Sequence, residues 1–177
     1  MKKIWLFFLI LVFAATAAGC ASFPTKRYIE TMPKVDKIFV ENAEVYLNKS
    51  EIWGRKEFKN RVDNMPYYKE VSEIYTAVLK QKLQEYGFIN LQYPEAGCLI
   101  IKTKIENQTP GVVGILIGGA VGRVIAEIQI SQNREDGEII PLLTFDNGGN
   151  TSKFLTSKIV IKVVARRVAK RVSKEFK

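Results

Sequence analysis

Residues 124–145 read VIAEIQISQNREDGEIIPLLTF, and their pattern predicts a pair of β-strands joined by a turn. Every second residue at its start is apolar, and the residues between them are mostly polar, the apolar set being Val124, Ala126, Ile128 and Ile130. Such alternation predicts a half-buried β-strand. Asp136-Gly137 is a turn signal, and the β-rich run 139–145 is expected to return as a second strand. Pro141 within that run indicates an edge position or a bulge.

Further strands are expected on the N-terminal side of this hairpin. Residues 98–106 place Leu99, Ile101 and Ile105 on one face and charged side chains on the other, which predicts another half-buried strand. The run 37–47 is rich in β-forming residues, although its alternation fails at Asn42, and residues 88–92 form a short β-rich run. These runs bring the expected sheet to about five strands.

Two long helices complete the expected fold. Apolar residues keep helical spacing from a start at Asn64 and Pro66 to a stop at Gly87. A second helix is expected over 151–177, and its many β-branched residues conflict with helix propensity, so packing must stabilise it. We therefore predict an α+β domain in which a mixed, mainly antiparallel sheet carries both helices on one face.

The stretch PGVVGILIGGAVG, residues 110–122, precedes the hairpin. It is no phosphate loop, because Ala120 and Val121 stand where such a loop needs Lys and Ser or Thr. A helix of this length would span roughly 20 Å, against a hydrocarbon core of about 30 Å. The remaining interpretation of this stretch is an apolar connection between two antiparallel strands. Either it folds back over the sheet, or Ile115, Leu116 and Ile117 stay exposed and contact a partner or a membrane.

The N-terminal residues indicate export. Residues 1–19 have the pattern of a signal peptide, in which Lys2 and Lys3 precede an apolar run and a set of small residues. Residues 20–35 contain two prolines and no apolar period, so we expect a tether there and a single α+β domain over 36–177. Loss of the signal peptide would lower the formal net charge of +9 by two units.

The end of the signal, Ala17-Ala18-Gly19-Cys20, resembles a bacterial lipobox, with Ala17 where that motif most often has Leu. The resemblance implies that Cys20 is lipidated and becomes the first residue of the mature chain. It also implies transfer to the outer membrane, because Ala21 rather than Asp follows the cysteine. Lipid chains on Cys20 would hold the domain at the membrane, facing the periplasm. The alternative is ordinary signal cleavage, which would give a secreted soluble protein that binds anionic lipid or lipopolysaccharide.

The reactive residues argue against catalysis. The chain has no histidine, so it lacks the usual general base and the commonest zinc ligand, and no pair of acidic residues has a spacing suited to acid-base work. Cys98 is the only cysteine besides Cys20 and precedes an apolar run, which favours a structural thiol near the end of a strand. We expect a non-enzymatic protein without metal or cofactor; the alternative is an enzyme whose site the sequence does not reveal.

The C-terminal helix is strongly basic. Cations recur every four residues with two arginines beside them, the full set being Lys158, Lys162, Arg166, Arg167, Lys170, Arg171 and Lys174. Glu175 is the one acidic residue over this length, so the opposite charges that would support the helix are missing. Two interpretations stay open: a solvated face, or contact with anionic lipid or lipopolysaccharide phosphates.

The C-terminal part of the chain also resembles a known family. The likeness rests on the segment Gly111 to Arg123, the strand after it, the Asp136-Gly137 turn, the Gly148-Gly149 pair and the terminal helix. These features are similar to those of exported bacterial proteins, many of them lipoproteins, that are known only as a domain of unknown function. The resemblance implies the small α+β fold of periplasmic secretion accessory proteins, including a domain of the curli secretion lipoprotein. It brings no catalytic residue. Export of a basic chain argues against nucleic acid as a partner and favours phospholipid headgroups, lipopolysaccharide phosphates or an acidic envelope protein.

Overall fold

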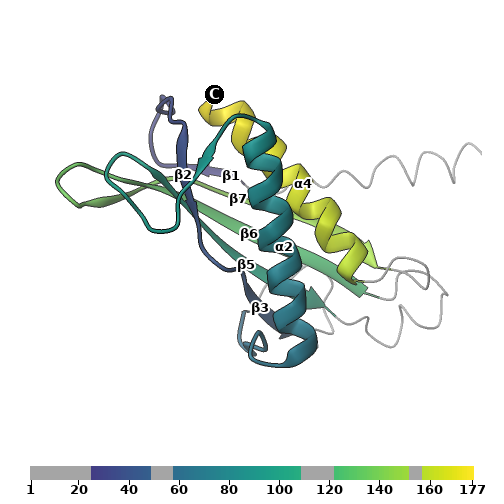
Figure 1. Ribbon diagram of the computed structural model, residues 1–177. Helices are drawn as coiled ribbons and strands as arrows, with labels where there is room; N and C mark the ends of the chain where they lie inside the picture. Colours follow the sequence, from purple (N-terminus) through teal and green to yellow (C-terminus); the bar gives the residue numbers. More distant parts are fainter. Residues whose placement is uncertain (1–24, 49–57, 109–121, 152–156) are drawn as a thin grey trace, which may run out of the picture.

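The computed structural model describes residues 25–48, 58–108, 122–151 and 157–177. Strands and helices follow in chain order as β1 (Thr25–Arg27), β2 (Lys37–Val40), β3 (Glu44–Asn48), α2 (Pro66–Glu85), β4 (Ile89–Asn90), β5 (Leu99–Gln108), β6 (Gly122–Asn133), β7 (Ile139–Thr151) and α4 (Ser157–Phe176). The strands form one twisted sheet, and the two helices lie side by side across one of its faces (Figure 1).

The sheet has the strand order β1-β7-β6-β5-β2-β4, and β3 pairs with β5 beyond the end of β2. The long pairs β5/β6 and β6/β7 are antiparallel, as is β1/β7. The pairs β2/β5, β3/β5 and β2/β4 are parallel. The predicted α+β class, mixed sheet and two helices on one face are therefore confirmed, whereas the described residues form seven strands rather than about five.

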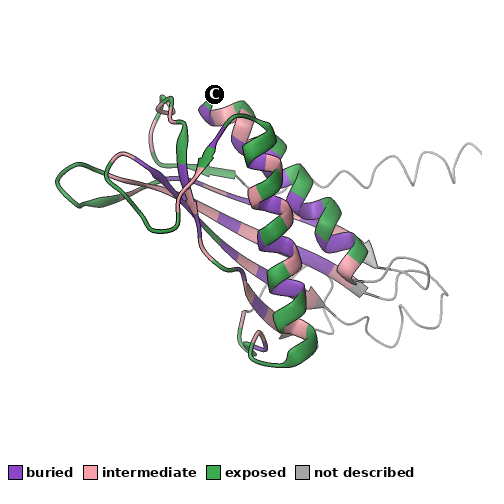
Figure 2. Ribbon diagram, viewed as in Figure 1, coloured by how far each residue is buried: buried purple, intermediate pink, exposed green. Residues whose placement is uncertain are grey.

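The core lies between the sheet and the helices. The alternation that predicted the hairpin holds, because Val124, Ala126, Ile128 and Ile130 are all buried beneath the helices. Helix α4 buries Ile161, Val164, Val168 and Val172 among others, and α2 buries Tyr75, Leu79 and Leu83. Figure 2 shows buried residues alternating with exposed ones along both helices. Packing thus compensates for the low helix propensity of the β-branched residues in α4.

The first predicted strand, 37–47, is divided into β2 and β3. Between them the backbone turns to α2: the Ala43 amide donates to Thr76 Oγ1 at 3.2 Å, and the Ser72 hydroxyl donates to the Ala43 carbonyl. Val40 lies opposite Ile101, but Glu44 lies opposite Lys104, so this edge carries one residue more than β5. The failure of alternation at Asn42 was the visible sign of this bulge.

The prediction of a tether over 20–35 is wrong for residues 25–35, which belong to the folded domain. Residues 25–27 form β1, which pairs with β7 at residues 143–145, and the Tyr28 amide donates to the Leu142 carbonyl at 3.0 Å. Ile29, Met32 and Val35 pack against the core. Three residues make a strand too short to show a period, which is why the sequence pattern missed it.

The turns and ends of the elements mostly agree with the prediction. Helix α2 begins at Pro66, and Gly87 follows it with a φ of +83°. Asp136-Gly137 turns the chain between β6 and β7, where Gly137 also has a φ of +83°. A bulge between Ile130 and Ser131 confirms the irregularity expected at Pro141. Strand β7 reaches Thr151, however, so α4 begins at Ser157 rather than at Thr151.

The connection at 110–122 joins antiparallel strands as predicted, because β5 and β6 pair from Leu99 to Gln108. Ile115, Leu116 and Ile117 lie outside the described residues, so their contact with a partner or membrane stays a prediction. The same holds for Cys20 and the signal peptide. Among the helices in the described ranges, neither is long and apolar enough to cross a membrane.

Candidate functional site: the basic face of helix α4

Three of the seven cations predicted on α4 are engaged with the rest of the domain. Lys158 forms an ion pair with Glu70 on α2, which ties the start of α4 to its neighbour. Arg167 Nη1 donates to the Gly148 carbonyl of β7 at 3.3 Å. Arg171 Nη2 donates to Thr25 Oγ1 at 2.7 Å, and its guanidinium lies 4.2 Å from the centroid of the Phe145 ring. These three side chains therefore stabilise the fold, and they do not belong to the candidate binding surface.

The other four cations point away from the sheet. We call Lys162, Arg166, Lys170 and Lys174 the basic face of α4; all four are exposed. Two apolar side chains share this face, Ile159 with 45% and Val163 with 37% of its surface exposed. Within the part of the chain that the structure describes, no carboxylate forms an ion pair with any of the four. The basic face is thus a row of cations that form no ion pair with the described residues, around two exposed aliphatic side chains.

Strand β1 lies beside this helix. Besides the bond from Arg171 to Thr25, Arg27 forms an ion pair with Glu175 at 2.8 Å. Glu175, the only acidic residue of α4, therefore points to β1 and leaves the basic face uncompensated. The described chain consequently begins at the flank of α4.

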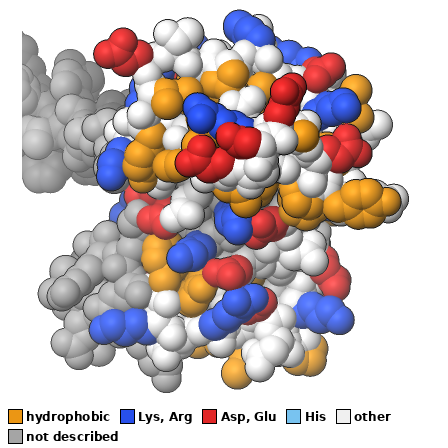
Figure 3. Space-filling view, turned by 90° about the vertical axis from the view of Figure 1, so that its left-hand side faces the viewer, with side chains coloured by type: hydrophobic (Ala, Val, Ile, Leu, Met, Phe, Trp, Pro, Cys, Tyr) orange, Lys and Arg blue, Asp and Glu red, His pale blue; other side chains and the backbone are white. Residues whose placement is uncertain are grey.

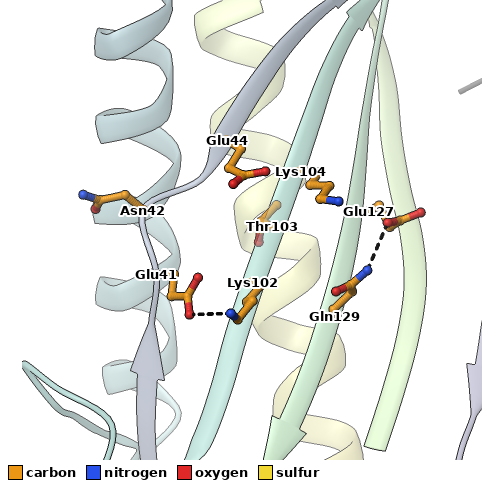
Figure 4. A pocket seen from close by; sticks show the side chains of 8 residues that line it. All are labelled: Glu41, Asn42, Glu44, Lys102, Thr103, Lys104, Glu127 and Gln129. Atoms are coloured by element: carbon orange, nitrogen blue, oxygen red, sulfur yellow. Dashed lines mark hydrogen bonds and ion pairs between the residues drawn. The ribbon is translucent and has the colours of Figure 1, made fainter. Parts of the chain in front are cut away.

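A second feature is a small pocket on the sheet face that the helices leave open. It has a volume of about 90 Å³ and lies at the bulge between β2 and β3, lined by Glu41, Asn42, Glu44, Lys102, Thr103, Lys104, Glu127 and Gln129 (Figure 4). Lys102 pairs with Glu41 at 3.0 Å, and Gln129 donates to Glu127 at 3.4 Å. Both charge signs occur in the lining, so it favours neither anions nor cations. No motif in the sequence predicted this pocket, and the broken alternation at Asn42 was the available signal.

The hydroxyl groups near this pocket are not poised as nucleophiles. Thr103 Oγ1 lies 3.3 Å from the Tyr75 hydroxyl, on the helix side of the sheet. Tyr46 donates its phenolic hydrogen to Glu44 at 2.6 Å, which, together with burial, raises the pKa of Tyr46 to about 12. Burial also raises the pKa of Tyr75, so both phenol groups are protonated near neutral pH, and their hydrogen bonds serve structure.

Residues 60–63 close the edge of the sheet next to Tyr46. The Leu47 amide donates to the Asn60 carbonyl at 2.9 Å, and the Val62 amide donates to the Val45 carbonyl at 2.8 Å. Arg61 bonds Asp63 at 2.7 Å and Glu44 at 2.9 Å, and the hydrogen bond from Arg61 lowers the pKa of Asp63. This cluster holds residues 60–63 against the edge strand β3. Its role is structural, because it covers a strand edge that would otherwise be exposed.

Cys98 is a structural thiol, as the sequence predicted. It directly precedes β5, is fully buried, and its carbonyl accepts the Asn133 amide at 3.0 Å. Burial raises the pKa of the thiol. The stability that the protonated thiol contributes is therefore complete below its ordinary pKa and is lost as the pH rises through the raised value.

We expect Cys98 to be unreactive in the folded protein. At mildly alkaline pH a thiol-specific reagent should modify the unfolded chain rapidly and the native chain only at the rate of unfolding, because the thiolate is disfavoured and inaccessible. Mass spectrometry after timed labelling measures this. Rapid modification of the native chain would show that the junction before β5 opens locally.

The described residues contain no group of three or more carboxylate or cysteine side chains that could hold a metal ion. Their acidic side chains instead pair with Arg and Lys across the surface, as at Glu44 and Glu175.

No protein-family model matches the chain, and no curated protein matches it. Among solved structures, the PelC dodecamer from Paraburkholderia phytofirmans is similar at 9% identity and a TM-score of 0.47, over 82% of this chain and 95% of that chain. A substituted form of that dodecamer gives 12% identity and a TM-score of 0.47, with coverages of 85% and 97%.

A minor lipoprotein from Acinetobacter baumannii is also similar, at 13% identity and a TM-score of 0.37, over 78% of this chain and 93% of that chain. Likenesses with TM-scores this low carry no conclusion about activity or partners. The functional interpretation therefore rests on the chain's own residues.

Proposed function

We propose that the protein is a lipid-anchored component of the bacterial cell envelope, held at the outer membrane by Cys20 and facing the periplasm. In this proposal it is a non-enzymatic accessory or binding protein. The observation that carries the proposal is how close the folded domain begins to the lipobox cysteine: β1 starts at Thr25, five residues after Cys20.

The short linker has a mechanical consequence. A fully extended chain advances at most 3.3–3.6 Å per residue, so Thr25 can lie no more than about 18 Å from Cys20. Strand β1 is itself fixed to β7 by pairing and to α4 by the ion pair of Arg27. A lipid on Cys20 would therefore keep the whole domain close to the membrane surface, because the linker is too short to let it move away.

The polar clusters support contact rather than catalysis. Glu41 and Glu44 are tied to Lys102 and Arg61, and the hydroxyl of Tyr46 donates to Glu44. Catalytic acids and bases need a free position for substrate and a pKa near the working pH. These groups instead neutralise one another in pairs across the sheet.

The test of the anchor is the variant Cys20→Ala. Wild-type protein should incorporate labelled palmitate and enter the detergent-rich phase, whereas the variant should incorporate none and enter the aqueous phase, because the thioether cannot form. Cys98→Ala is the matched control and should keep both properties. Wild-type protein that incorporates no palmitate and stays in the aqueous phase would make a secreted soluble protein the better description, and labelling that persists in Cys20→Ala would refute Cys20 as the site of the lipid.

A further inference from the structure

We propose that the basic face of α4 docks on the anionic phospholipid headgroups of the membrane that carries the lipid anchor. This inference rests on the proposed lipid attachment at Cys20 and adds an orientation to it: the helix layer faces the membrane, and the open face of the sheet faces the periplasm. The ligand chemistry is the phosphate of an anionic phospholipid.

The first support is the charge of the surface. Lys162, Arg166, Lys170 and Lys174 are exposed, and among the described residues none of them has an ion-pair partner. Each is four residues from the next, a spacing that makes neighbours on a helix, and like charges at this spacing destabilise the helix. A layer of anionic phosphates removes that repulsion and attracts all four side chains at once.

The distribution of charge elsewhere gives a contrast. The end of the molecule that carries the β6–β7 turn shows acidic and basic side chains interspersed (Figure 3). Arg134 at this turn pairs with Glu138, and Lys102 on the open face pairs with Glu41. These two cations thus have carboxylate partners, whereas the four cations of the basic face form no ion pair with the described residues.

The second support is the apolar content of the same face. Ile159 and Val163 lie among the cations with 45% and 37% of their surfaces exposed. Aliphatic side chains flanked by Lys and Arg suit the boundary between headgroups and acyl chains, where the cations meet phosphates while the apolar groups leave water. Exposed Ile159 and Val163 would not stabilise a helix surface that contacts only water.

The third support is the reach of the anchor. Thr25 accepts a hydrogen bond from Arg171 on the flank of α4, so the chain toward Cys20 leaves beside this helix. Five extended residues span about 18 Å, and a helix with its side chains is about 10–12 Å across. Lipid chains on Cys20 can therefore enter a membrane that lies against the outer surface of α4.

The experiment uses the full-length lipidated protein in vesicles of phosphatidylcholine alone or of phosphatidylcholine with phosphatidylglycerol. An environment-sensitive fluorophore on Val163→Cys reports on the basic face, and the same fluorophore on Glu135→Cys, in the β6–β7 turn, is the control; buried Cys98 stays unlabelled. With phosphatidylglycerol, the emission of the Val163 reporter should shift to the blue, and high salt should reverse the shift. The Glu135 reporter should not respond.

Charge reversal sharpens the test. Each cation near an anionic surface strengthens docking roughly fivefold, so Arg166→Glu with Lys170→Glu should weaken it at least about 25-fold. Lys102→Glu with Arg134→Glu changes the net charge equally on other surfaces, where the two side chains are 53% and 52% exposed, and should leave docking unchanged. Circular dichroism checks the fold of both variants.

The outcomes separate the inference from the proposed function. Sedimentation of the protein with vesicles of phosphatidylcholine alone measures the anchor, because this zwitterionic lipid offers the basic face no net charge. If the protein sediments with neutral vesicles but the Val163 reporter stays in water with phosphatidylglycerol, docking of α4 is refuted and the anchor stands. If the protein does not bind neutral vesicles, the proposed anchor fails, and a salt-sensitive shift with phosphatidylglycerol would still support the basic face.

Discussion

Replacing Phe176 by Ala is expected to lower the free energy of unfolding by about 3–5 kcal/mol. Phe176 is the last helical residue of α4 and the penultimate residue of the chain, yet its side chain is fully buried. Its carbonyl also accepts the Val35 amide at 3.3 Å, which joins the end of α4 to the segment before β2. Removing the phenyl ring leaves a cavity between the end of α4 and the segment before β2. Urea unfolding followed by circular dichroism measures the change.

Phe176→Leu is the control for this site. It keeps most of the apolar volume, so we expect a loss of less than about 1.5 kcal/mol. A second comparison is Ile159→Ala on the exposed side of the same helix, which should change stability little because its side chain already contacts water. A loss below about 1 kcal/mol for Phe176→Ala would mean that the last turn of α4 is frayed in solution.

The central strands and both helices could be predicted because their residues are sorted by burial at a fixed period. In β6 the even-numbered residues from Val124 to Ile130 face the helices, and the same parity makes the sequence alternate. The short strand β1 could not be predicted, and the break at residues 41–43 was marked only by the lost alternation at Asn42. Their geometry depends on partners distant in sequence, namely β7 for Thr25–Arg27 and the hydroxyls of Ser72 and Thr76 for Ala43.

The basic helix shows the same limit at the level of a site. Every fourth residue of a helix advances by about 40° around the axis, so five cations at this spacing spread over roughly 160°. Lys158 at one end of this arc consequently reaches Glu70 on α2, while Arg167 and Arg171 fall on the flank facing β7 and β1. Sequence spacing identified the basic surface, and only the packing of α4 showed which four cations form no ion pair with the described part of the chain.

The second large effect is expected at Gly149, one residue of the glycine pair near the end of β7. This residue faces α4, and a Cβ atom built on it would lie 2.8 Å from Val160 Cγ1. Valine is branched at Cβ and buried at this position, so it cannot turn aside, and Gly149→Ala must push α4 away from the sheet. We expect a loss of about 1–3 kcal/mol in the free energy of unfolding, measured by urea denaturation.

The clash can be separated from other effects of the substitution by a double-mutant cycle with Val160→Ala. Removing the Val160 methyl groups costs stability alone, but it also opens the space that the Gly149→Ala methyl would enter. The double variant should therefore be more stable than the sum of the single losses predicts, by about 0.5–3 kcal/mol. Strict additivity would refute the contact between β7 and α4 as the cause. The requirement for glycine at this position would then lie in the strand backbone itself, independent of the helix packed above it.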